Sequence, residues 1–206
     1  MYVPDHFREA RPAVLHDFVR DHSFGTLVSH VDGEPFATHL PFLLDAGRGP
    51  HGTLRAHLAR ANPHWRSFQE GTTSLVIFQG PHAYVSPSWY ATPVAVPTWN
   101  YTAVHVHGQP RLVEDREELR ALVDDTVRLY EQLYPEPWRM DRLDEALVDK
   151  MLDNIVGFEI TIDRLEGKLK LSQNRSAADR EGVIAALTRQ GDEQSLAVAA
   201  LMRAPT

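Results

Sequence analysis

The sequence predicts a mainly β protein, an antiparallel barrel with peripheral helices. Six or seven segments of strand composition follow one another at short spacing, and most of the helical patterns come late in the chain. Because helices do not alternate with strands, a parallel sheet wound from βαβ units is disfavoured. A length of 206 residues fits one domain. We expect a single domain over residues 1–206, with a helical insertion at about 115–155 and a C-terminal helical tail at about 176–206.

The first half of the chain predicts one helix followed by strands. Pro12 suits the first turn of a helix, and apolar residues then recur at helical spacing, which predicts a helix over roughly 12–22. Asp32-Gly33 is a strong signal for a hairpin turn between two strands. A short helix is expected within 59–70, restarting after Asn62-Pro63. The strands predicted in this half cover 26–31, 35–44, 53–58, 73–78 and 83–86.

The middle of the chain changes from strand to helix. A long strand is expected over 100–108, continuing through 111–113. Asp115, followed three residues later by Glu118, has the spacing of a capping box, and apolar residues at helical period then run to Leu133. A second helix is expected from about residue 141. Its predicted apolar face consists of Leu143, Leu147, Met151 and Ile155.

The end of the chain predicts more strands and two more helices. The strands are expected at 157–162 and 167–171. Ser176 can cap the next helix, and Gly191 ends it because glycine readily adopts the left-handed conformation that follows many helices. An Ala-rich final helix over 196–202 has the composition of a tail whose end often frays.

Composition excludes several classes of protein. The chain has no Cys, so disulfides, thiol catalysis and thiolate metal sites are excluded. No apolar run approaches ~20 residues and the first segment lacks an apolar signal core, so we expect a cytoplasmic protein that does not cross a membrane. The net charge of −7 and the long, acidic helical patterns make direct DNA binding doubtful.

Two polar-basic clusters are candidates for holding a phosphate, although no Gly-rich phosphate loop is present. Arginine and lysine donors near the end of a strand can hold such a group. For any single arginine, a solvated charged edge is the more common role. The run KLKLSQNR at 168–175 is the stronger signal, because it holds two of the three lysines of an acidic chain. The first cluster consists of Arg55, His57, Arg60 and Asn62.

Residues 80–108 form a turn-rich stretch with many aromatic and histidine side chains. Aromatic faces on short strands suit a flat ligand, and they equally suit a dimer interface. His105 and His107 lie on the same strand face, because side chains repeat every two residues. Without a further ligand they predict no metal site. Haem or metal ligation stays open, since His39, His57 and His82 could join them in space.

Six blocks of the sequence resemble one family in order along nearly the whole chain. They are MYVPDHF at the start, HLPFLL at 39–44, HLARANPHW at 57–65, VIFQGPHAYVSPSWY at 76–90, VPTWNYTAVHVHG at 96–108 and KLKLSQNR at 168–175. The sequence is thereby identified as similar to the PaiB family of FMN-binding negative transcriptional regulators. More broadly it resembles the FMN-binding split barrels, which are antiparallel Greek-key β barrels with added helices. Those proteins are homodimers with two flavin sites at the subunit interface.

The resemblance implies where FMN would bind. The strand-to-helix segment 55–63 corresponds to the phosphate region, which makes Arg55, His57, Arg60 and Asn62 phosphate candidates. The ring would lie on strand backbone near Thr38, His39 and Leu40. A partner chain would contribute from the aromatic stretch or from the basic run. These residues are Trp99, Asn100, Lys170, Ser172, Gln173, Asn174 and Arg175.

Three functions are compatible with this resemblance. The first is a homodimeric flavoprotein that acts as a negative transcriptional regulator. The second is a flavin-dependent oxidoreductase using NAD(P)H, in which FMN performs the hydride chemistry and His39, His82, His105 or Tyr84 could serve as acid or base. The third is a haem-binding or haem-degrading protein, because the chain has eleven His.

Overall fold

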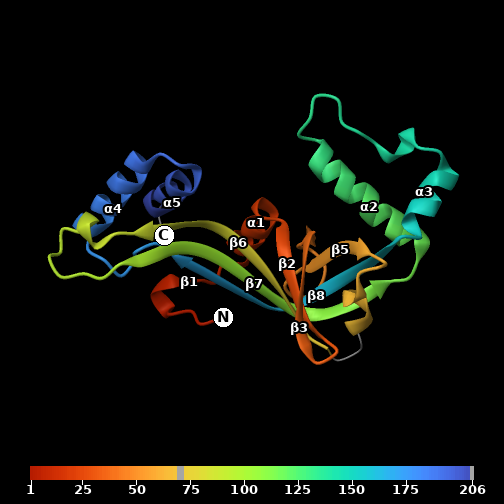
Figure 1. Cartoon of the computed structure of the whole chain (residues 1–206), viewed down its shortest axis with the longest axis horizontal. Helices are drawn as coiled ribbons and strands as arrows, with labels where there is room; N and C mark the ends of the chain where they lie inside the picture. The colour runs from red at the N-terminus through yellow and green to blue at the C-terminus, as the bar shows by residue number, and fades with distance from the viewer. Residues whose placement is uncertain (69–71, 205–206) are drawn as a thin grey trace. The chain divides into compact units, whose positions relative to one another are not determined.

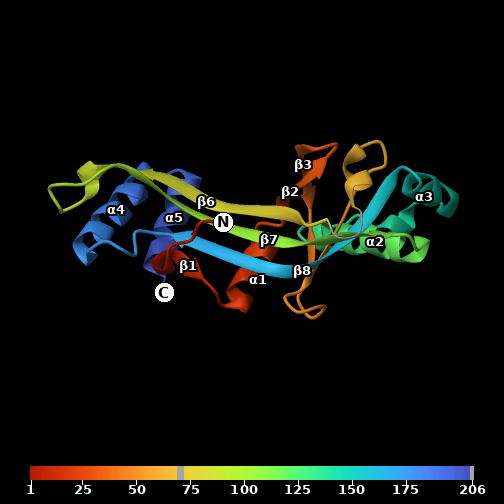
Figure 2. The same cartoon turned by 90° about the horizontal axis from the view of Figure 1, so that it is seen from below.

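The computed structural model describes residues 1–68 and 72–204, and within them eight strands form one antiparallel sheet (Figure 1, Figure 2). The strand order is β3-β2-β6-β7-β8-β5-β4, and β1 pairs with β8. This confirms a mainly β fold with peripheral helices. The strands are β1 (Arg8–Glu9), β2 (Phe24–Val31), β3 (Glu34–Pro41), β4 (Leu43–Asp45), β5 (Thr53–Ala59), β6 (Ser74–Val85), β7 (Thr98–Val113) and β8 (Ile155–Lys170).

The helices occur along the chain in the order that the sequence patterns predict. No helix in the described ranges is both long and apolar enough to cross a membrane. The α-helices are α1 (Pro12–Asp21), α2 (Arg116–Glu131), α3 (Glu145–Leu152), α4 (Ala177–Gln190) and α5 (Glu193–Arg203). Short 3₁₀ turns are η1 (Asp5–Phe7), η2 (Pro63–Ser67), η3 (Pro87–Trp89) and η4 (Met140–Arg142). The helix predicted within 59–70 is the 3₁₀ turn η2, and its last two predicted residues lie outside the described part of the chain.

The chain divides into two compact units. Unit 1 comprises Met1–Phe18, Phe78–His105 and Glu166–Thr206, and unit 2 comprises Val19–Ile77 and Val106–Leu165. Strands β6, β7 and β8 each contain residues of both units. Each candidate residue therefore belongs to one unit or to the other.

In unit 2 the β2–β3 hairpin turns as predicted. Asp32 and Gly33 have φ angles of 52° and 85°, the left-handed conformation that such a tight turn requires. The strand predicted over 35–44 is wrong in one respect, because it divides at Phe42. The Phe42 amide donates to the Ser23 carbonyl at 2.9 Å, and β4 beyond it pairs with β5 instead of β2. The chain thus changes neighbours at this residue.

The helices of unit 2 are capped by aspartates. The Asp115 carboxylate accepts from the Glu118 amide at 2.9 Å, which confirms the predicted start of α2. The predicted apolar face of the helix that follows α2 is wrong. Helix α3 starts only after Asp144, its N-cap, and its buried residues are Val148 and Leu152. The Asp144 cap fixes where the helix begins, so the predicted face is displaced and Leu147 is exposed.

Two predicted strand breaks are absent. Most of the segments 73–78 and 83–86 belongs to the single strand β6, and 157–162 and most of 167–171 belong to β8. Pro81 interrupts no ladder with β2, because β2 pairs with β6 only at 75–77. At Gly167, opposite Glu9 of β1, a Cβ would lie 2.2 Å from Leu15 Cδ2, so glycine here permits close packing and does not end the strand.

The core of unit 1 is formed by helices α4 and α5 on the ends of β6 and β8. Ser176 caps α4, and Gly191 follows it with a φ of 74°, as predicted. The expectation of a frayed final helix is wrong, because Val198, Ala199 and Met202 of α5 are fully or almost fully buried. They pack in one cluster with Ala83, Val85, Leu171, Val183 and Leu187. Burial of the apolar residues of α5 therefore keeps this helix ordered to its end, although the local sequence alone predicts fraying.

Candidate functional site

The residues predicted to hold FMN form two groups, one in each unit. In unit 2 they lie on β3, on β5 and in the turn that leads into η2. In unit 1 they lie on β7 and at the end of β8. The first group is Thr38, His39, Leu40, Arg55, His57, Arg60 and Asn62. The second group is Trp99, Asn100, Lys170, Ser172, Gln173, Asn174 and Arg175.

In unit 2 a hydrogen-bond network joins β3 to the turn before η2. Asn62 caps η2, its Oδ1 accepting from the His64 amide at 3.0 Å. Its Nδ2 donates to Thr38 Oγ1 at 3.1 Å, and His64 Nδ1 lies 2.8 Å from the same oxygen. The structure therefore brings Thr38 and Asn62 together. Sequence reasoning missed His64, although its place directly after the Asn62-Pro63 signal puts it in the same turn.

His64 is a fully buried imidazole. Burial disfavours its charged form and lowers its pKa to about 4, so the ring is neutral near pH 7. Its ring centroid lies 5.1 Å from that of Phe36 and 5.7 Å from that of Phe68. Nε2 is buried and has no partner among the described residues. The neighbouring strand residues alternate as a half-buried strand should, with Leu40 inward and His39 exposed.

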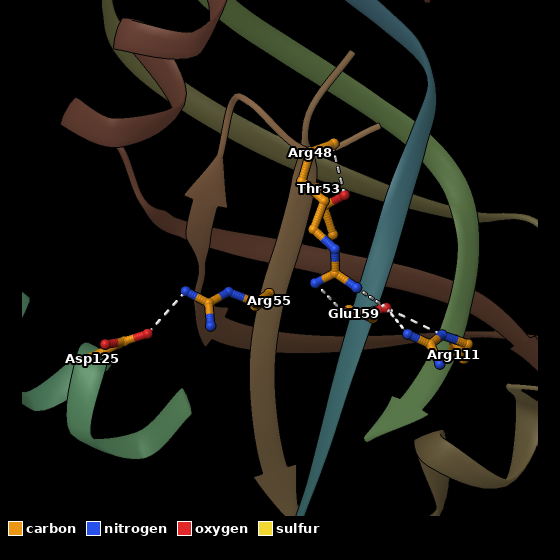
Figure 3. Close-up of polar contacts among 6 residues, drawn as sticks. All are labelled: Arg48, Thr53, Arg55, Arg111, Asp125 and Glu159. Atoms are coloured by element: carbon orange, nitrogen blue, oxygen red, sulfur yellow. Dashed lines mark hydrogen bonds and ion pairs between the residues drawn. The ribbon is translucent and has the colours of Figure 1, made fainter. Parts of the chain in front are cut away.

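Arg55 has one paired and one unpaired donor among the described residues. Its Nη2 lies 3.0 Å from Oδ2 of Asp125 on α2 (Figure 3). Its Nε is buried and has no acceptor within the described ranges. A buried N–H without an acceptor is costly, and an oxyanion at this position would satisfy it. His57 lies two residues along β5 on the same face, and burial lowers its pKa.

Arg60 is engaged in the structure in a different way. Its Nε donates to the Asp153 carbonyl at 2.7 Å, and its Nη2 donates to the Ile155 carbonyl at 2.8 Å. Its backbone amide donates to the Asn154 carbonyl at 2.8 Å. These acceptors lie just past the end of α3, where helix carbonyls lack intrahelical partners. The guanidinium thus ties the end of α3 to β5, whereas Arg55 keeps a donor available.

A second polar cluster, also missed by sequence reasoning, lies beside Arg55 (Figure 3). Glu159 of β8 is buried, and Arg48 Nη1 lies 2.7 Å from its Oε2 while Arg111 contacts its Oε1. Burial opposes ionisation of Glu159, but the hydrogen bonds and charges of Arg111 and Arg48 outweigh it and hold its pKa below the ordinary value. Glu159 is the cross-strand partner of Arg55, but its carboxylate pairs with the other two arginines instead.

Arg111 also lines an open cavity of unit 2 with a volume of about 850 Å³. Its other charged lining residues are acidic, among them Glu114, Glu118 and Asp163. Such a lining repels a phosphate. The cavity therefore offers a less suitable phosphate site than Arg55.

In unit 1 two of the predicted residues contact each other, and others contact different neighbours. Asn100 is fully buried, and its Nδ2 donates to Ser172 Oγ at 3.0 Å. Ser172 has a φ of 62°, a left-handed backbone that turns the chain after β8. Gln173 Oε1 accepts from the Leu171 amide at 2.7 Å, and the Arg175 guanidinium lies 4.6 Å from the centroid of the Tyr90 ring. Asn174 is exposed.

The second group also contains an aromatic and a basic side chain outside the Asn100–Ser172 contact. Trp99 is exposed, and its ring centroid lies 5.9 Å from that of Tyr84 and 6.2 Å from that of His82. Lys170 donates to Thr98 Oγ1, and burial together with the charge of Lys168 lowers its pKa. The two lysines alternate with Leu169 and Leu171, which pack toward the α4–α5 core, so the lysines face the opposite side.

The structure defines the class of protein as a split β-barrel of the kind found in flavin-binding proteins. It is similar to "Structure of the FAD and Heme binding protein from Mycobacterium smegmatis", with a TM-score of 0.58, 21% identity, and coverage of 87% of this chain and 79% of that chain. It is also similar to the flavocytochrome Anf3 from Azotobacter vinelandii, with a TM-score of 0.57, 14% identity, and coverage of 82% of this chain and 72% of that chain. Such distant similarity shows the fold alone.

Residues 1–164 match the family model described as "Putative FMN-binding domain", and the chain belongs to this FMN-binding family. It is 38% identical over 202 residues to "Protease synthase and sporulation protein PAI 2" of Bacillus subtilis (strain 168), covering 98% of this chain and 96% of that protein. It is also 33% identical over 242 residues to "Uncharacterized protein AN0679" of Emericella nidulans, covering 98% and 96%. The resemblance to PaiB proteins is thereby confirmed.

Proposed function

We propose that this FMN-binding chain holds the flavin phosphate at Arg55, and that the loaded protein acts as a PaiB-like negative regulator of transcription. The observation that carries the phosphate assignment is the buried Arg55 Nε without an acceptor, on the strand that continues into the Asn62 turn. A phosphate fits this donor set, because it accepts charge-assisted hydrogen bonds from arginine. His57, two residues along, borders the same place as a neutral donor.

The flavin ring is proposed to lie along β3 at Thr38, His39 and Leu40. The Asn62–Thr38–His64 network supports this, because it fixes β3 relative to the turn beyond the phosphate residues. When bound, FMN would supply one- or two-electron redox chemistry. The role of the described side chains is to position the ring and to exclude water from it.

We propose a homodimer in which the second group completes the site from the partner chain. The exposed aromatic side chain of Trp99 suits a flat ring, and the ammonium of Lys170 suits a negative charge. This proposal requires two copies of the 23.3 kDa chain in solution, measurable by light scattering. A monomer that binds FMN with full affinity would contradict it.

The regulatory role is supported by the relative from Bacillus subtilis, whose name refers to protease synthesis and sporulation. We propose a cytoplasmic protein that acts through a partner, because the acidic chain offers no basic reading helix for DNA. Specific, salt-resistant binding to a promoter fragment in a gel shift would contradict the indirect route. Consumption of NADPH or NADH by the FMN-loaded protein would favour an oxidoreductase, and a Soret band on haem titration would favour a haem protein.

The decisive experiment is FMN titration of the purified protein, followed by quenching of flavin fluorescence. Arg55→Met should weaken FMN binding about 10- to 100-fold, the cost of one or two charge-assisted hydrogen bonds. Arg66→Met is the matched control, because Arg66 is exposed on η2 and stacks on Trp65. Equal affinity of both variants would refute the phosphate assignment. A wild-type protein that binds no FMN would refute the cofactor as well.

A further inference from the structure

Arg55 has a resident carboxylate partner, Asp125, on α2 (Figure 3). The two residues are separated by 70 positions and joined by one contact of 3.0 Å. Both side chains are partly exposed, so the pair is accessible to a ligand. The cross-strand neighbour Glu159 is paired with Arg48 and Arg111, and no ion pair joins it to Arg55 among the described residues. Asp125 is thus the described carboxylate that neutralises Arg55.

A phosphate bound at Arg55 lies next to the Asp125 carboxylate. Like charges disfavour each other at such short range, and the repulsion is strongest at low salt. The same carboxylate exerts little force on a neutral flavin. Asp125 should therefore affect phosphorylated and unphosphorylated flavins differently.

The contact also holds one part of α2 on β5. The start of α2 is fixed by burial, because Leu119 and Leu122 pack tightly against Gly157, where a Cβ would lie 2.7 Å from Leu119 Cδ1. Val123 still packs against the apolar cluster of Leu119, and the later part of the helix makes two polar contacts with other elements, the Arg55–Asp125 pair and the 2.7 Å contact between Tyr130 Oη and Ser23 Oγ. Loss of the arginine contact would loosen this part of the helix first.

We propose that Asp125 competes with the flavin phosphate for Arg55, so that it sets the preference between FMN and riboflavin and links occupancy of the site to the docking of α2. This rests on the proposed function, because it takes Arg55 as the phosphate residue. Linkage makes the coupling reciprocal: whatever loosens α2 strengthens FMN binding, and FMN loosens α2. The helical insertion thereby becomes the part of the chain that responds to the ligand.

The test compares Asp125→Asn with Asp124→Asn by titration with FMN and with riboflavin. Asp124 is a matched control, because it lies on the same helix and pairs with Arg128 at 2.7 Å, not with Arg55. Both variants change the net charge equally. Asp125→Asn should bind FMN about three- to fivefold more tightly at low salt, with a smaller gain at high salt and unchanged affinity for riboflavin. Asp124→Asn should match the wild type with both flavins.

Equal gains in both variants, or an equal gain for FMN and riboflavin, would overturn the competition. If the wild type binds no FMN, the proposed function fails instead, so the two failures are distinguishable. Hydrogen exchange of the unmodified protein gives a second readout that requires no variant to fold. FMN should accelerate exchange of amides in 123–131 and riboflavin should not. Protection of this segment by FMN would also overturn the proposal.

Discussion

His64 makes the stability of the protein depend on pH. The side chain is fully buried and its pKa is about 4, against an ordinary value of 6.5. Because the folded-state pKa is lowered, the unfolded chain binds more protons below pH 6.5, and stability falls as the pH drops from about 6.5 to about 4. The shift corresponds to roughly 3 kcal/mol over that range.

Urea unfolding between pH 7.5 and pH 4.5 measures this effect. His64→Leu should be less stable than the wild type at pH 7.5, because Thr38 loses a partner, but its stability should fall less steeply below pH 6.5. His39→Asn is the control, since His39 is exposed. If the unfolding free energies of the wild type and of His64→Leu fall equally steeply with decreasing pH, another group causes the acid sensitivity.

Gly182 controls how closely α4 packs on η3. A Cβ at this position would lie 2.1 Å from the Trp89 carbonyl oxygen, a backbone atom that cannot move away cheaply. Alanine in place of glycine inside a helix ordinarily stabilises by about 1 kcal/mol. For Gly182→Ala we expect the opposite sign. The free energy of unfolding should fall by about 1–3 kcal/mol, because the helix must shift. Thermal unfolding of Gly182→Ala measures it.

Gly47→Ala serves as the comparison for this prediction. Its Cβ would meet only one atom, the Asp45 Oδ1 at 3.7 Å, which is an ordinary contact. A stabilised Gly182→Ala variant would mean that α4 and η3 do not hold the separation described. Near-wild-type stability of Gly47→Ala is expected in either case.

Elements whose signals are local could be predicted from the sequence. The caps at Asp115 and Ser176, the Asp32-Gly33 turn and the stop at Gly191 are each fixed by side chains a few residues apart. The continuity of β6 through Pro81 could not be predicted, because it depends on which strand lies at that edge of the sheet. Burial of α5 likewise depends on a partner surface that periodicity does not reveal.

The candidate site likewise contains some residues that could be predicted from the sequence and others that could not. Resemblance pointed to Arg55 and Asn62, and the structure shows a donor without an acceptor on one and a network around the other. Asp125 could not be predicted as a partner, because nothing in the helical pattern of 116–131 distinguishes it from Asp124. The Glu159 cluster is hidden for a similar reason, since its three members come from distant parts of the chain.

At the scale of the whole molecule, we predict that both compact units unfold together as a single domain. The physical reason is that β6, β7 and β8 pass through both units, so neither unit can lose its strands alone. The four tryptophans allow a direct measurement. Trp65 and Trp138 report on unit 2, and Trp89 and Trp99 on unit 1.

Variants that retain tryptophan in only one unit, with the others replaced by Phe, should show coincident urea transitions. The α-helical circular dichroism should follow the same curve, because α2 and α4 belong to different units. Two separated midpoints would show that the units are independent domains. In that case the single-domain expectation would have to be abandoned.

The matched family region and the folded core end at different places. The match stops at residue 164, whereas the core of unit 1 draws on Leu171 and on helices α4 and α5. A fragment cut at the family boundary would keep Ala83 and Val85 but lose the side chains that cover them. Such a fragment should aggregate and be degraded quickly in the cell, because apolar side chains would be exposed. This is expected although every position recognised by the family model would be present. Boundaries for expression or for crystallisation should therefore follow the burial of α5.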